Sequence, residues 1–593
     1  MVDLRRSHLL QPGAVFCCSV SIAVLTTWPE TALAQDVLNL EPPPVDSRVQ
    51  RLDNFPDLRN YNLGSATLRQ PSLSPPWQSM PYTLNGTLGL PAGEGPFPVV
   101  MLLHGRHAGC HFVDGATPSP WPCPAGTETR FDQGLAYLAQ SLTDAGYLTL
   151  APNLNAAYAN AYGATAANRT DLTEARSQHI IDAHLNALLS ANGGDSAGFG
   201  VSLRGKVDLS QLAIIGHSLG GGAAVHLARL GIASPTHPST AGDGATIQAL
   251  LLIAPTPSRS METAPGAYEL PDIPTSIVVG ACDRDIYDLS SLFYFETANH
   301  SPNRQTQVTA LLVPGANHNF FNAAVTEDDY YRQPNNHPLC SPQQSPLRLS
   351  RVEQERFLKN YTLTFLAQTL ASHHQLSALP SQGNSPLQPY PEKTPGVQAP
   401  FNVAPAAAKR RRIFSFSAGG DLQSEPLPSG QVTVEPCQSF QSCGQDSSRH
   451  PLFPSVLHIT WAQGGVQLRW PIPPDIELQN AQSLHLRVAP GSGPNLSARP
   501  SGFAVVLRDQ SGQATRVEVP ASSPALQRLP SHLSQPPTML TYPSLVSIPL
   551  GQFRGVDITR LTAVDLVFDP DSEGGIYLAE VEFVGREMKG EGG

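Results

Sequence analysis

Ser218 stands at the centre of a G-x-S-x-G pentapeptide, residues 216–220. Such a serine can act as a nucleophile when it sits on a tight turn between a strand and a helix, where small flanking residues allow close packing. The apolar residues 211–216 are typical of a strand, and the small residues 220–230 are typical of a helix. This setting predicts Ser218 as a nucleophile, with the N–H of Leu219 facing a developing oxyanion. The alternative is a glycine-rich turn without a catalytic role.

A serine hydroxyl is a poor nucleophile until a base takes its proton. His318 follows an expected strand at residues 308–313, in a loop from which an imidazole can reach the nucleophile. The order nucleophile, acid, base along the chain is one of the orders in which such triads occur. We therefore predict His318 as the general base, and a capping or surface histidine is the alternative.

The acid of such a triad is expected between these two residues. Asp283 follows an expected strand at 275–280 and lies in a G-x-x-D-x-x-I arrangement. A carboxylate at the end of that strand can orient the imidazole. We favour Asp283, but Asp285 and Asp288 are near enough to compete. Those not used by the triad are expected to hold the loop through turn hydrogen bonds.

A second oxyanion donor is expected in the loop after the strand at 97–103. Gly105 allows the backbone to approach the nucleophile closely there. The N–H of Arg106 is the predicted donor, and His107 is the runner-up. Alternatively, this loop merely ends the strand. A triad with such an oxyanion hole needs neither a metal ion nor an organic cofactor, and we expect none.

Apolar runs of strand length alternate with helical patterns throughout the region that holds these residues. This alternation implies right-handed βαβ units and a parallel sheet covered by helices on both faces. We therefore predict an α/β catalytic domain at residues 81–371, built on a doubly wound, mostly parallel sheet. Expected strands lie at 97–103, 147–151, 211–216, 249–253, 275–279 and 308–313, and expected helices at 131–145, 172–189, 220–230 and 351–370.

The composition changes after this domain. Residues 372–408 are rich in Pro, Gln and Ser, as an interdomain linker would be. The basic run 409–412 is typical of a solvated boundary. From 409 to 593, helical patterns vanish, and short alternating runs are separated by Gly, Pro, Asn and Ser turns. This part is predicted to be an all-β sandwich or jelly-roll domain.

The N-terminus has the pattern of an export signal. Arg5 and Arg6 precede an apolar stretch at 14–25, and an Ala-Leu-Ala site follows at 32–34. We predict a signal peptide at residues 1–34 and a periplasmic or extracellular location, with an N-terminal membrane anchor as the alternative. Residues 35–80 are expected to be irregular. No later stretch is long and apolar enough for a membrane helix, so the mature chain is expected to have none.

Six of the eight cysteines remain after that signal peptide. An even number in an exported chain favours disulfides, and free buried thiols are the alternative. By proximity along the chain, the predicted pairs are Cys110–Cys123, Cys282–Cys340 and Cys437–Cys443.

The charge of the chain bears on its partners. A formal net charge of −11 and a pI near 5.9 argue against nucleic acid, because phosphate neutralisation needs a basic face. The expected partner is an ester substrate, either a small molecule or a polymer.

The residues quoted above resemble the α/β-hydrolase superfamily, and within it the dienelactone-hydrolase-like and cutinase-like bacterial polyester hydrolases. Residues 216–222, Gly-His-Ser-Leu-Gly-Gly-Gly, are similar to the G-H-S-M-G-G-G elbow of these enzymes, and residues 315–318 are similar to their G-A-S-H segment. The resemblance covers residues 82–370 and implies a Ser-His-Asp esterase. The chain departs from the family at Arg106 and His107, where a substrate-binding aromatic is expected, and at the unmatched segment 323–343.

The C-terminal part resembles galactose-binding-like or carbohydrate-binding jelly rolls. Residues 576–583 are similar to the closing strand of those modules. The resemblance implies polysaccharide as a second partner, bound through exposed aromatics. Trp461, Trp470 and Tyr542 are the aromatics in question, and a core position is favoured for each of them.

These observations predict an exported serine hydrolase that cleaves carboxylic esters through an acyl-enzyme. A peptidase or an acyltransferase on the same fold is the alternative among enzymes. A glycan- or surface-binding protein with an inactive hydrolase half is the alternative outside them.

Overall fold

The computed structural model describes residues 50–110, 121–165, 168–195, 198–230, 245–257, 266–330, 339–341, 345, 347–370, 399–417, 422–437, 454–462, 464–491, 502–527, 529–530, 539–540, 542–568 and 573–586. The predicted signal peptide lies outside these residues and stays a prediction. Within the described ranges, no helix is long and apolar enough to cross a membrane.

A ten-stranded sheet carries the predicted site residues. Its strand order is β1-β2-β3-β5-β4-β6-β7-β8-β9-β10. The six neighbouring strands from β5 to β9 run parallel, and antiparallel strands complete both ends. The sheet is therefore mostly parallel, as predicted. Its strands are β1 (Gln50–Leu52), β2 (Phe55–Arg69), β3 (Ser79–Gly89), β4 (Phe97–Leu103), β5 (Leu148–Pro152), β6 (Val207–His217), β7 (Ile247–Ile253), β8 (Thr275–Gly280), β9 (Val308–Val313) and β10 (Phe401–Ala404).

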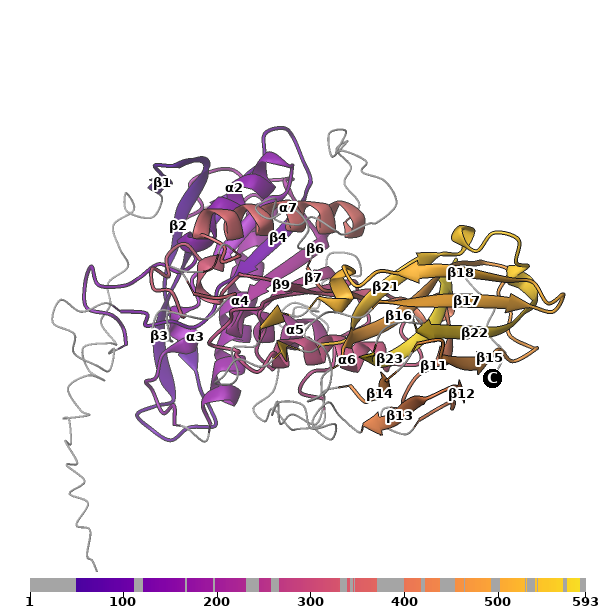
Figure 1. Cartoon of the computed structure of the whole chain (residues 1–593). Coiled ribbons are helices and arrows are strands. Elements are labelled where there is room, and N and C mark those ends of the chain that lie inside the picture. Colours follow the sequence, from indigo (N-terminus) through magenta and orange to yellow (C-terminus); the bar gives the residue numbers. More distant parts are fainter. Residues whose placement is uncertain are drawn as a thin grey trace, which may run out of the picture. The chain divides into compact units, whose positions relative to one another are not determined.

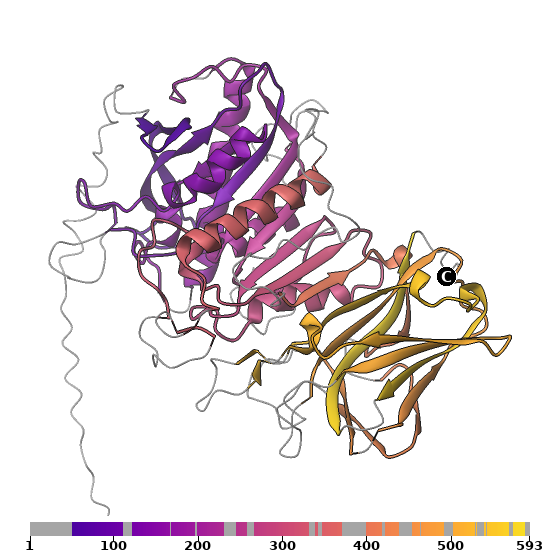
Figure 2. The same ribbon diagram turned by 45° about the horizontal axis from the view of Figure 1, so that its top comes forward.

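Helices cover both faces of this sheet (Figures 1 and 2). On one face α2 and α7 pack together, and on the other α5 packs against α4, which in turn contacts α3. A further helix, α6, lies beside β9 and β10. This layering confirms the predicted α/β class. The helices are α2 (Ala136–Asp144), α3 (Asn155–Tyr158), α4 (Arg169–Gly193), α5 (Leu219–Leu230), α6 (Phe293–Asn299) and α7 (Arg351–Thr369).

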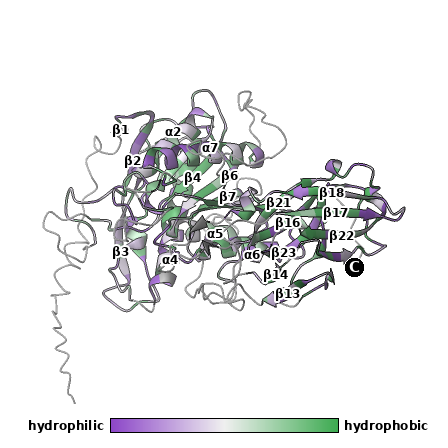
Figure 3. Cartoon of the chain, in the orientation of Figure 1, coloured by the Kyte–Doolittle hydropathy of each residue, from purple (hydrophilic) through white to green (hydrophobic). Residues whose placement is uncertain are grey.

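The central strands are hydrophobic because both of their faces are covered. Every residue of β4, β8 and β9 is buried. Figure 3 shows hydrophobic residues concentrated in the neighbouring strands β4, β6 and β7. Parallel strands present their carboxyl ends at one edge, where loops can converge on a ligand. The register pairs Leu103 with Gly216 and Gly280 with Val313, so that β4 ends within one residue of β6, and β8 ends level with β9.

The expectation of an irregular segment at 35–80 is wrong where the structure describes it. Residues 50–52 and 55–69 form β1 and β2, and β3 begins at residue 79. Most side chains of β2 are partly or fully exposed, and a register shift between Asn62 and Ser65 interrupts its alternation. The strand therefore lacks the hydrophobic period by which strands are recognised in a sequence.

The expected linker also ends earlier than predicted. Residues 401–404 form β10, which pairs antiparallel with β9 and extends the sheet. A sheet edge offers unpaired backbone groups to any adjacent extended segment. The sequence analysis did not predict this short edge strand, because the composition around it is rich in proline. The rest of the expected linker, residues 372–398, lies outside the described residues.

The C-terminal part is a sandwich of two antiparallel sheets, as predicted. One sheet has the order β13-β14-β23-β16-β21, with β11 also paired to β23, and the other has the order β12-β15-β22-β17-β18. Trp461, Trp470 and Tyr542 are buried, which confirms the favoured core position. The strands are β11 (Arg410–Phe414), β12 (Leu427–Ser429), β13 (Val432–Cys437), β14 (Val456–Trp461), β15 (Gln467–Pro471), β16 (Ala481–Pro490), β17 (Phe503–Asp509), β18 (Ala514–Val519), β21 (Ser544–Pro549), β22 (Leu561–Phe568) and β23 (Gly574–Gly585), beside the small pair β19 (Leu529–Pro530) and β20 (Met539–Leu540).

Short 3-10 helices punctuate both parts. They are η2 (Gln133–Leu135), η3 (Ser290–Leu292), η4 (Asn319–Phe321), η5 (Ala407–Lys409), η7 (Pro524–Leu526), η8 (Leu550–Gln552) and η9 (Ile558–Arg560).

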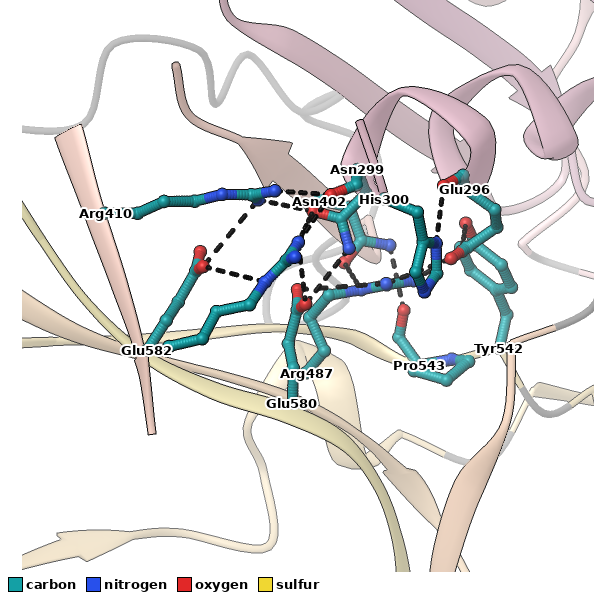
Figure 4. Close-up of polar contacts among 11 residues, drawn as sticks. Glu296, Asn299, His300, Asn402, Arg410, Arg487, Tyr542, Pro543, Glu580 and Glu582 are labelled. Atoms are coloured by element: carbon teal, nitrogen blue, oxygen red, sulfur yellow. Dashed lines mark hydrogen bonds and ion pairs between the residues drawn. The ribbon is translucent and has the colours of Figure 1, made fainter. Parts of the chain in front are cut away.

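The expectation of a solvated boundary at 409–412 is wrong for Arg410, which is buried in β11. Its guanidinium donates a hydrogen bond of 2.6 Å to Asn299 Oδ1 on α6. It belongs to a cluster of charged side chains drawn from α6, β11, β16 and β23 (Figure 4). The members of this charge cluster are Glu296, Arg410, Arg412, Arg487, Glu580 and Glu582.

Three arginines face three glutamates in the charge cluster, so its formal charges balance. Arg487 holds Glu296 through two hydrogen bonds, of 2.5 and 3.1 Å, and the Tyr542 hydroxyl donates a third at 2.5 Å. Burial and the neighbouring Glu580 raise the pKa of Glu582 to about 7. Since charges out of water must be paired, each member depends on the others.

Candidate active site

Ser218 stands on the turn between β6 and α5, as predicted. Its φ of 56° lies in the left-handed region, which is unfavourable for a residue with a Cβ. The turn is anchored, since Ser218 donates its N–H to Ile253 O at 2.9 Å and accepts the N–H of Gly221 at 2.9 Å. The strained serine is therefore held at the carboxyl edge of the sheet, as in a nucleophile elbow.

The glycines around Ser218 are required because there is no room for a Cβ atom at their positions. A Cβ on Gly216 would lie 2.3 Å from Gly220 O, and a Cβ on Gly220 would lie 2.4 Å from Leu103 O. Both contacts are with backbone atoms, which cannot move aside without shifting β4 or α5. The spacing of the pentapeptide thus follows from the packing of the turn against its own helix and the adjacent strand.

His318 and Asp283 form a buried pair. His318 Nδ1 lies 2.8 Å from Asp283 Oδ2, and both side chains are fully shielded from solvent. The other carboxylate oxygen of Asp283 accepts the N–H groups of Asp285 and Ile286 at 2.9 and 2.7 Å. Because these bonds fix the carboxylate, Asp283 is placed to orient the imidazole through Nδ1.

Asp285 lies on the opposite side of the same ring. Its Oδ2 is 3.4 Å from His318 Nε2. That nitrogen is buried and makes no hydrogen bond with any described residue. Asp285 is 63% exposed and lines the pocket that also holds Ser218. Asp288, the third carboxylate considered, accepts the N–H of Ser290 at 3.0 Å and so caps the turn before η3.

Asp329 is a further carboxylate near His318, and the sequence analysis did not predict it. Asp329 accepts the backbone N–H groups of Arg284, His318 and Asn319, at 2.9, 3.1 and 3.1 Å. It lies in the segment without a counterpart in the resembled family. The run Glu327-Asp328-Asp329 shortly after the predicted base is the signal that could have pointed to it.

The charges around His318 favour its protonated form. Burial by itself would lower the pKa of His318, but Asp283, Asp285 and Asp329 outweigh it and raise the pKa to about 9. Burial and the negative charge of Asp283 in turn raise the pKa of Asp329. The ring is thus held in a strongly negative surrounding.

Of two further histidines, His217 packs against this ring and His107 packs against His217. His217, from β6, donates its Nε2–H to His318 O at 3.1 Å, and the two ring centroids are 4.8 Å apart. Burial and the charge of His318 lower the pKa of His217 and lower that of His107 to about 3. Both are therefore neutral. The described residues include no group of His, Cys, Asp or Glu with the geometry of a metal site.

The loop after β4 reaches the nucleophile. A Cβ on Gly105 would lie 2.6 Å from Ser218 Cβ and 3.2 Å from its Oγ. His104 holds the loop, because its Nδ1–H donates to Gly105 O at 2.8 Å while its Nε2 accepts the N–H of Leu154 at 2.8 Å. The structure thus brings together the predicted oxyanion loop and the elbow.

A pocket of about 930 Å³ opens over Ser218. The pocket is lined by the two residues predicted to donate to the oxyanion, Leu219 and Arg106, by the alternative donor His107, and by several charged side chains. Its lining residues are Arg106, His107, Ser218, Leu219, Thr256, Arg284, Asp285, Ile286, Asn319, Thr326, Glu327, Asp328 and Asp329.

Two of the three predicted disulfides are confirmed. Cys110 is bonded to Cys123, and Cys282 to Cys340. The second bridge ties the loop that carries Asp283 to the chain beyond His318. Cys437 is also disulfide-bonded. Its predicted partner Cys443 lies outside the described residues, and that pair stays a prediction.

Comparisons with known proteins find distant structural similarity. No protein-family model and no curated protein matches the sequence. Among solved structures, Est1E from Butyrivibrio proteoclasticus is 12% identical, with a TM-score of 0.26 over 51% of this chain and 99% of that one. Thermogutta terrifontis esterase 2, phosphoramylated by tabun, is 14% identical, with a TM-score of 0.28 over 52% and 97%.

The family 11 carbohydrate-binding module of cellulase Lic26A-Cel5E from Clostridium thermocellum is also similar. It is 8% identical, with a TM-score of 0.20 over 31% of this chain and 98% of that module. Similarities at this level do not place the chain in a family.

Proposed function

We propose that this chain is a serine hydrolase that cleaves carboxylic esters through an acyl-enzyme. Ser218 attacks the acyl carbon, and His318 takes the serine proton and returns it to the leaving alcohol. Asp283 orients the imidazole and stabilises its charged form. The N–H groups of Leu219 and Arg106 hold the oxyanion, and such a donor typically contributes about 10²–10³ in rate.

One observation supports this proposal above the others. A serine in a strained strand-to-helix turn lies on a pocket wall, at the same sheet edge as a buried Asp–His pair. Strain at a non-glycine residue and a buried charged pair each cost stability. Their coincidence at one edge of the sheet is expected of a catalytic site and not of a structural turn.

The position of the pocket favours esters over peptides. Extended peptides are commonly held by pairing with a free strand edge. The ten-stranded sheet ends at β1 and β10, whereas the pocket residues follow the interior strands β4, β6, β7, β8 and β9. A volume of about 930 Å³ lies within the range of small-molecule sites. We therefore keep peptidase and acyltransferase activity as alternatives only.

The sandwich bears on the glycan-binding alternative. Its described aromatic side chains are all buried, so glycan stacking finds no support among the described residues. These aromatics are Phe414, Phe416, Trp461, Trp470, Phe503, Tyr542, Phe553, Phe568, Tyr577 and Phe583. Polysaccharide binding by this part stays a prediction.

Export is part of the proposal. Disulfides form and persist in oxidising compartments, and the structure contains Cys110–Cys123 and Cys282–Cys340. Together with the predicted signal peptide, they favour a periplasmic or extracellular enzyme.

The test is hydrolysis of p-nitrophenyl esters, from acetate to palmitate, by the full chain purified under oxidising conditions. Ser218→Ala is expected to lose at least about 10⁴ in kcat/KM, because the nucleophile is removed. Labelling by a fluorophosphonate should disappear with it. Ser210→Ala, an exposed serine on the same strand, should keep both activity and labelling. Hydrolysis by the folded Ser218→Ala variant at the wild-type rate would refute the assignment.

A further inference from the structure

We propose that Asp285 holds His318 in a charged, inactive state in the free enzyme, and that substrate entering the pocket releases the base by displacing the Asp285 carboxylate. This inference rests on the proposed function. It assigns Asp285 a regulatory role at the site, distinct from the orienting role of Asp283.

The geometry places one carboxylate at each ring nitrogen. Asp283 Oδ2 is 2.8 Å from Nδ1, and Asp285 Oδ2 is 3.4 Å from Nε2. A neutral imidazole carries one N–H, so it can satisfy only one of the two. With the proton on Nδ1, the lone pair of Nε2 would face a carboxylate oxygen. Protonation of both nitrogens removes this repulsion and turns the second contact into an ion pair.

The other groups near the ring are a further carboxylate and two neutral histidines, with the arginines Arg106 and Arg284 on the pocket wall. Asp329, from the segment after η4, adds a third carboxylate. His217 from β6 packs against the ring, His107 from the loop after β4 packs against His217, and burial keeps both uncharged. Removing Asp285 therefore leaves a surrounding that is still negative but less so.

The two contacting carboxylates differ in how easily they can leave. Asp283 is fully buried and accepts two backbone N–H groups, so it stays in place. Asp285 is 63% exposed and stands on the pocket wall with Ser218. An ester bound over Ser218 occupies the space beside Nε2 that Asp285 fills in the free enzyme. Displacement lowers the pKa of the ring, the Nε2 proton passes to water, and the free lone pair can then accept the Ser218 proton.

The experiment is the pH dependence, from pH 5 to 10, of Ser218 labelling by a fluorophosphonate in the full chain. The second-order rate constant reports the pKa of the free-enzyme base. In the wild type, the acidic limb is expected above the ordinary histidine value of 6.5, in keeping with the raised pKa of His318. In Asp285→Asn, the acidic limb of the pH profile should shift to a pH lower by about one unit or more, because the negative charge beside the His318 ring is lost.

This shift has a simple readout. At a pH on the wild-type limb, a downward shift of one unit makes Asp285→Asn react about tenfold faster. Glu327→Gln is the matched control, since Glu327 is an exposed carboxylate on the same pocket wall and is not among the main groups that raise the pKa of His318. Its limb should coincide with that of the wild type. Asp285→Ser should show the same shift. This second variant tests whether the shift comes from the lost carboxylate and not from the asparagine side chain that replaces it.

Three outcomes would overturn the inference. Coincident limbs for wild type, Asp285→Asn and Glu327→Gln would show that Asp285 does not hold the ring. Loss of labelling at every pH in folded Asp285→Asn and Asp285→Ser would show that Asp285 is needed for reaction and does not restrain it. A folded wild type that is not labelled at any pH would remove the proposed function itself, which is a different result from a missing shift.

Discussion

Gly105 is the residue through which the loop after β4 approaches Ser218, the proposed nucleophile. The space for a Cβ there is taken by Ser218 Cβ at 2.6 Å. Contacts under 3 Å force one of the two backbones to move, and either movement disturbs the oxyanion position. The lack of a side chain at Gly105 is thus required for the loop to approach Ser218.

We therefore expect Gly105→Ala to lower kcat/KM by at least about 10²-fold, the typical effect of removing one oxyanion donor. The p-nitrophenyl ester assay measures it. Gly109→Ala is the matched control in the same loop, because its Cβ would meet Asn155 at an ordinary 3.5 Å. Full activity of Gly105→Ala would contradict the close approach of this loop to Ser218.

At the residue scale, the sequence predicted the members of the site and favoured Asp283 as its acid, but it could not place the other carboxylates. Asp283, Asp285 and Asp288 are separated by only a few positions, and all follow β8. Their roles differ because the turn sends Asp283 inward onto Nδ1, Asp285 to the pocket wall and Asp288 to a cap. Asp329 could not be assigned at all, because its contact with the His318 backbone depends on the path of a loop.

At the element scale, the bridge Cys282–Cys340 connects the two loops that carry the proposed acid and base. Cys282 is the direct neighbour of Asp283, and Cys340 is 58 positions further along the chain. Closing a long loop removes more entropy from the unfolded chain than closing a short one. The bridge Cys110–Cys123 closes only 13 positions and serves as the comparison.

We expect Cys282→Ser/Cys340→Ser to lose about 1 kcal/mol more stability than Cys110→Ser/Cys123→Ser, from the ratio of the loop lengths. Denaturant unfolding of both double variants under oxidising conditions measures the difference. The first variant should also lose activity in proportion to the loosening of Asp283. Equal stabilities together with unchanged activity in the first variant would show that the bridge does not support the site.

Element prediction succeeded where apolar runs were continuous and failed where they were not. The central strands β4, β6, β7, β8 and β9 are buried on both faces, so burial alone makes them apolar. In contrast, β2 and β10 belong to the ends of the sheet. These strands form mainly because their backbones pair with a neighbouring strand. Backbone pairing does not require apolar side chains at regular positions, so the hydrophobic pattern does not predict them.

At the scale of the whole molecule, the charge cluster joins α6 to the sandwich strands (Figure 4). Glu296 is contributed by α6, and Arg487 and Glu580 by β16 and β23. The cluster is supported by apolar packing, since Leu545 of the sandwich contacts the core on the sheet side. The sandwich therefore contacts both α6, through Glu296, and β10, through Asn402.

Arg487→Met is expected to destabilise the chain by about 3–5 kcal/mol, because it leaves Glu296 buried without its cation. Arg516→Met, which breaks an exposed pair with Glu518 on the same sandwich, should cost no more than about 1 kcal/mol. Denaturant unfolding compares the two. If both variants were equally stable, the charge cluster would not contribute to the union of sheet and sandwich.

The sequence by itself determined the features that depend on local chemistry: the strand-to-helix turn at Ser218, the class of both parts and the two confirmed disulfides. A turn motif, an apolar run and a cysteine spacing are each set by neighbouring residues, so they can be read without knowing the rest of the chain.

Only the tertiary structure decided which carboxylate meets which nitrogen of His318, and that Arg410 is buried. These features join residues tens to hundreds of positions apart, such as Asn299 and Glu580. The free energy of a charged side chain depends on the partners and the burial that folding brings to it, and no local pattern encodes them.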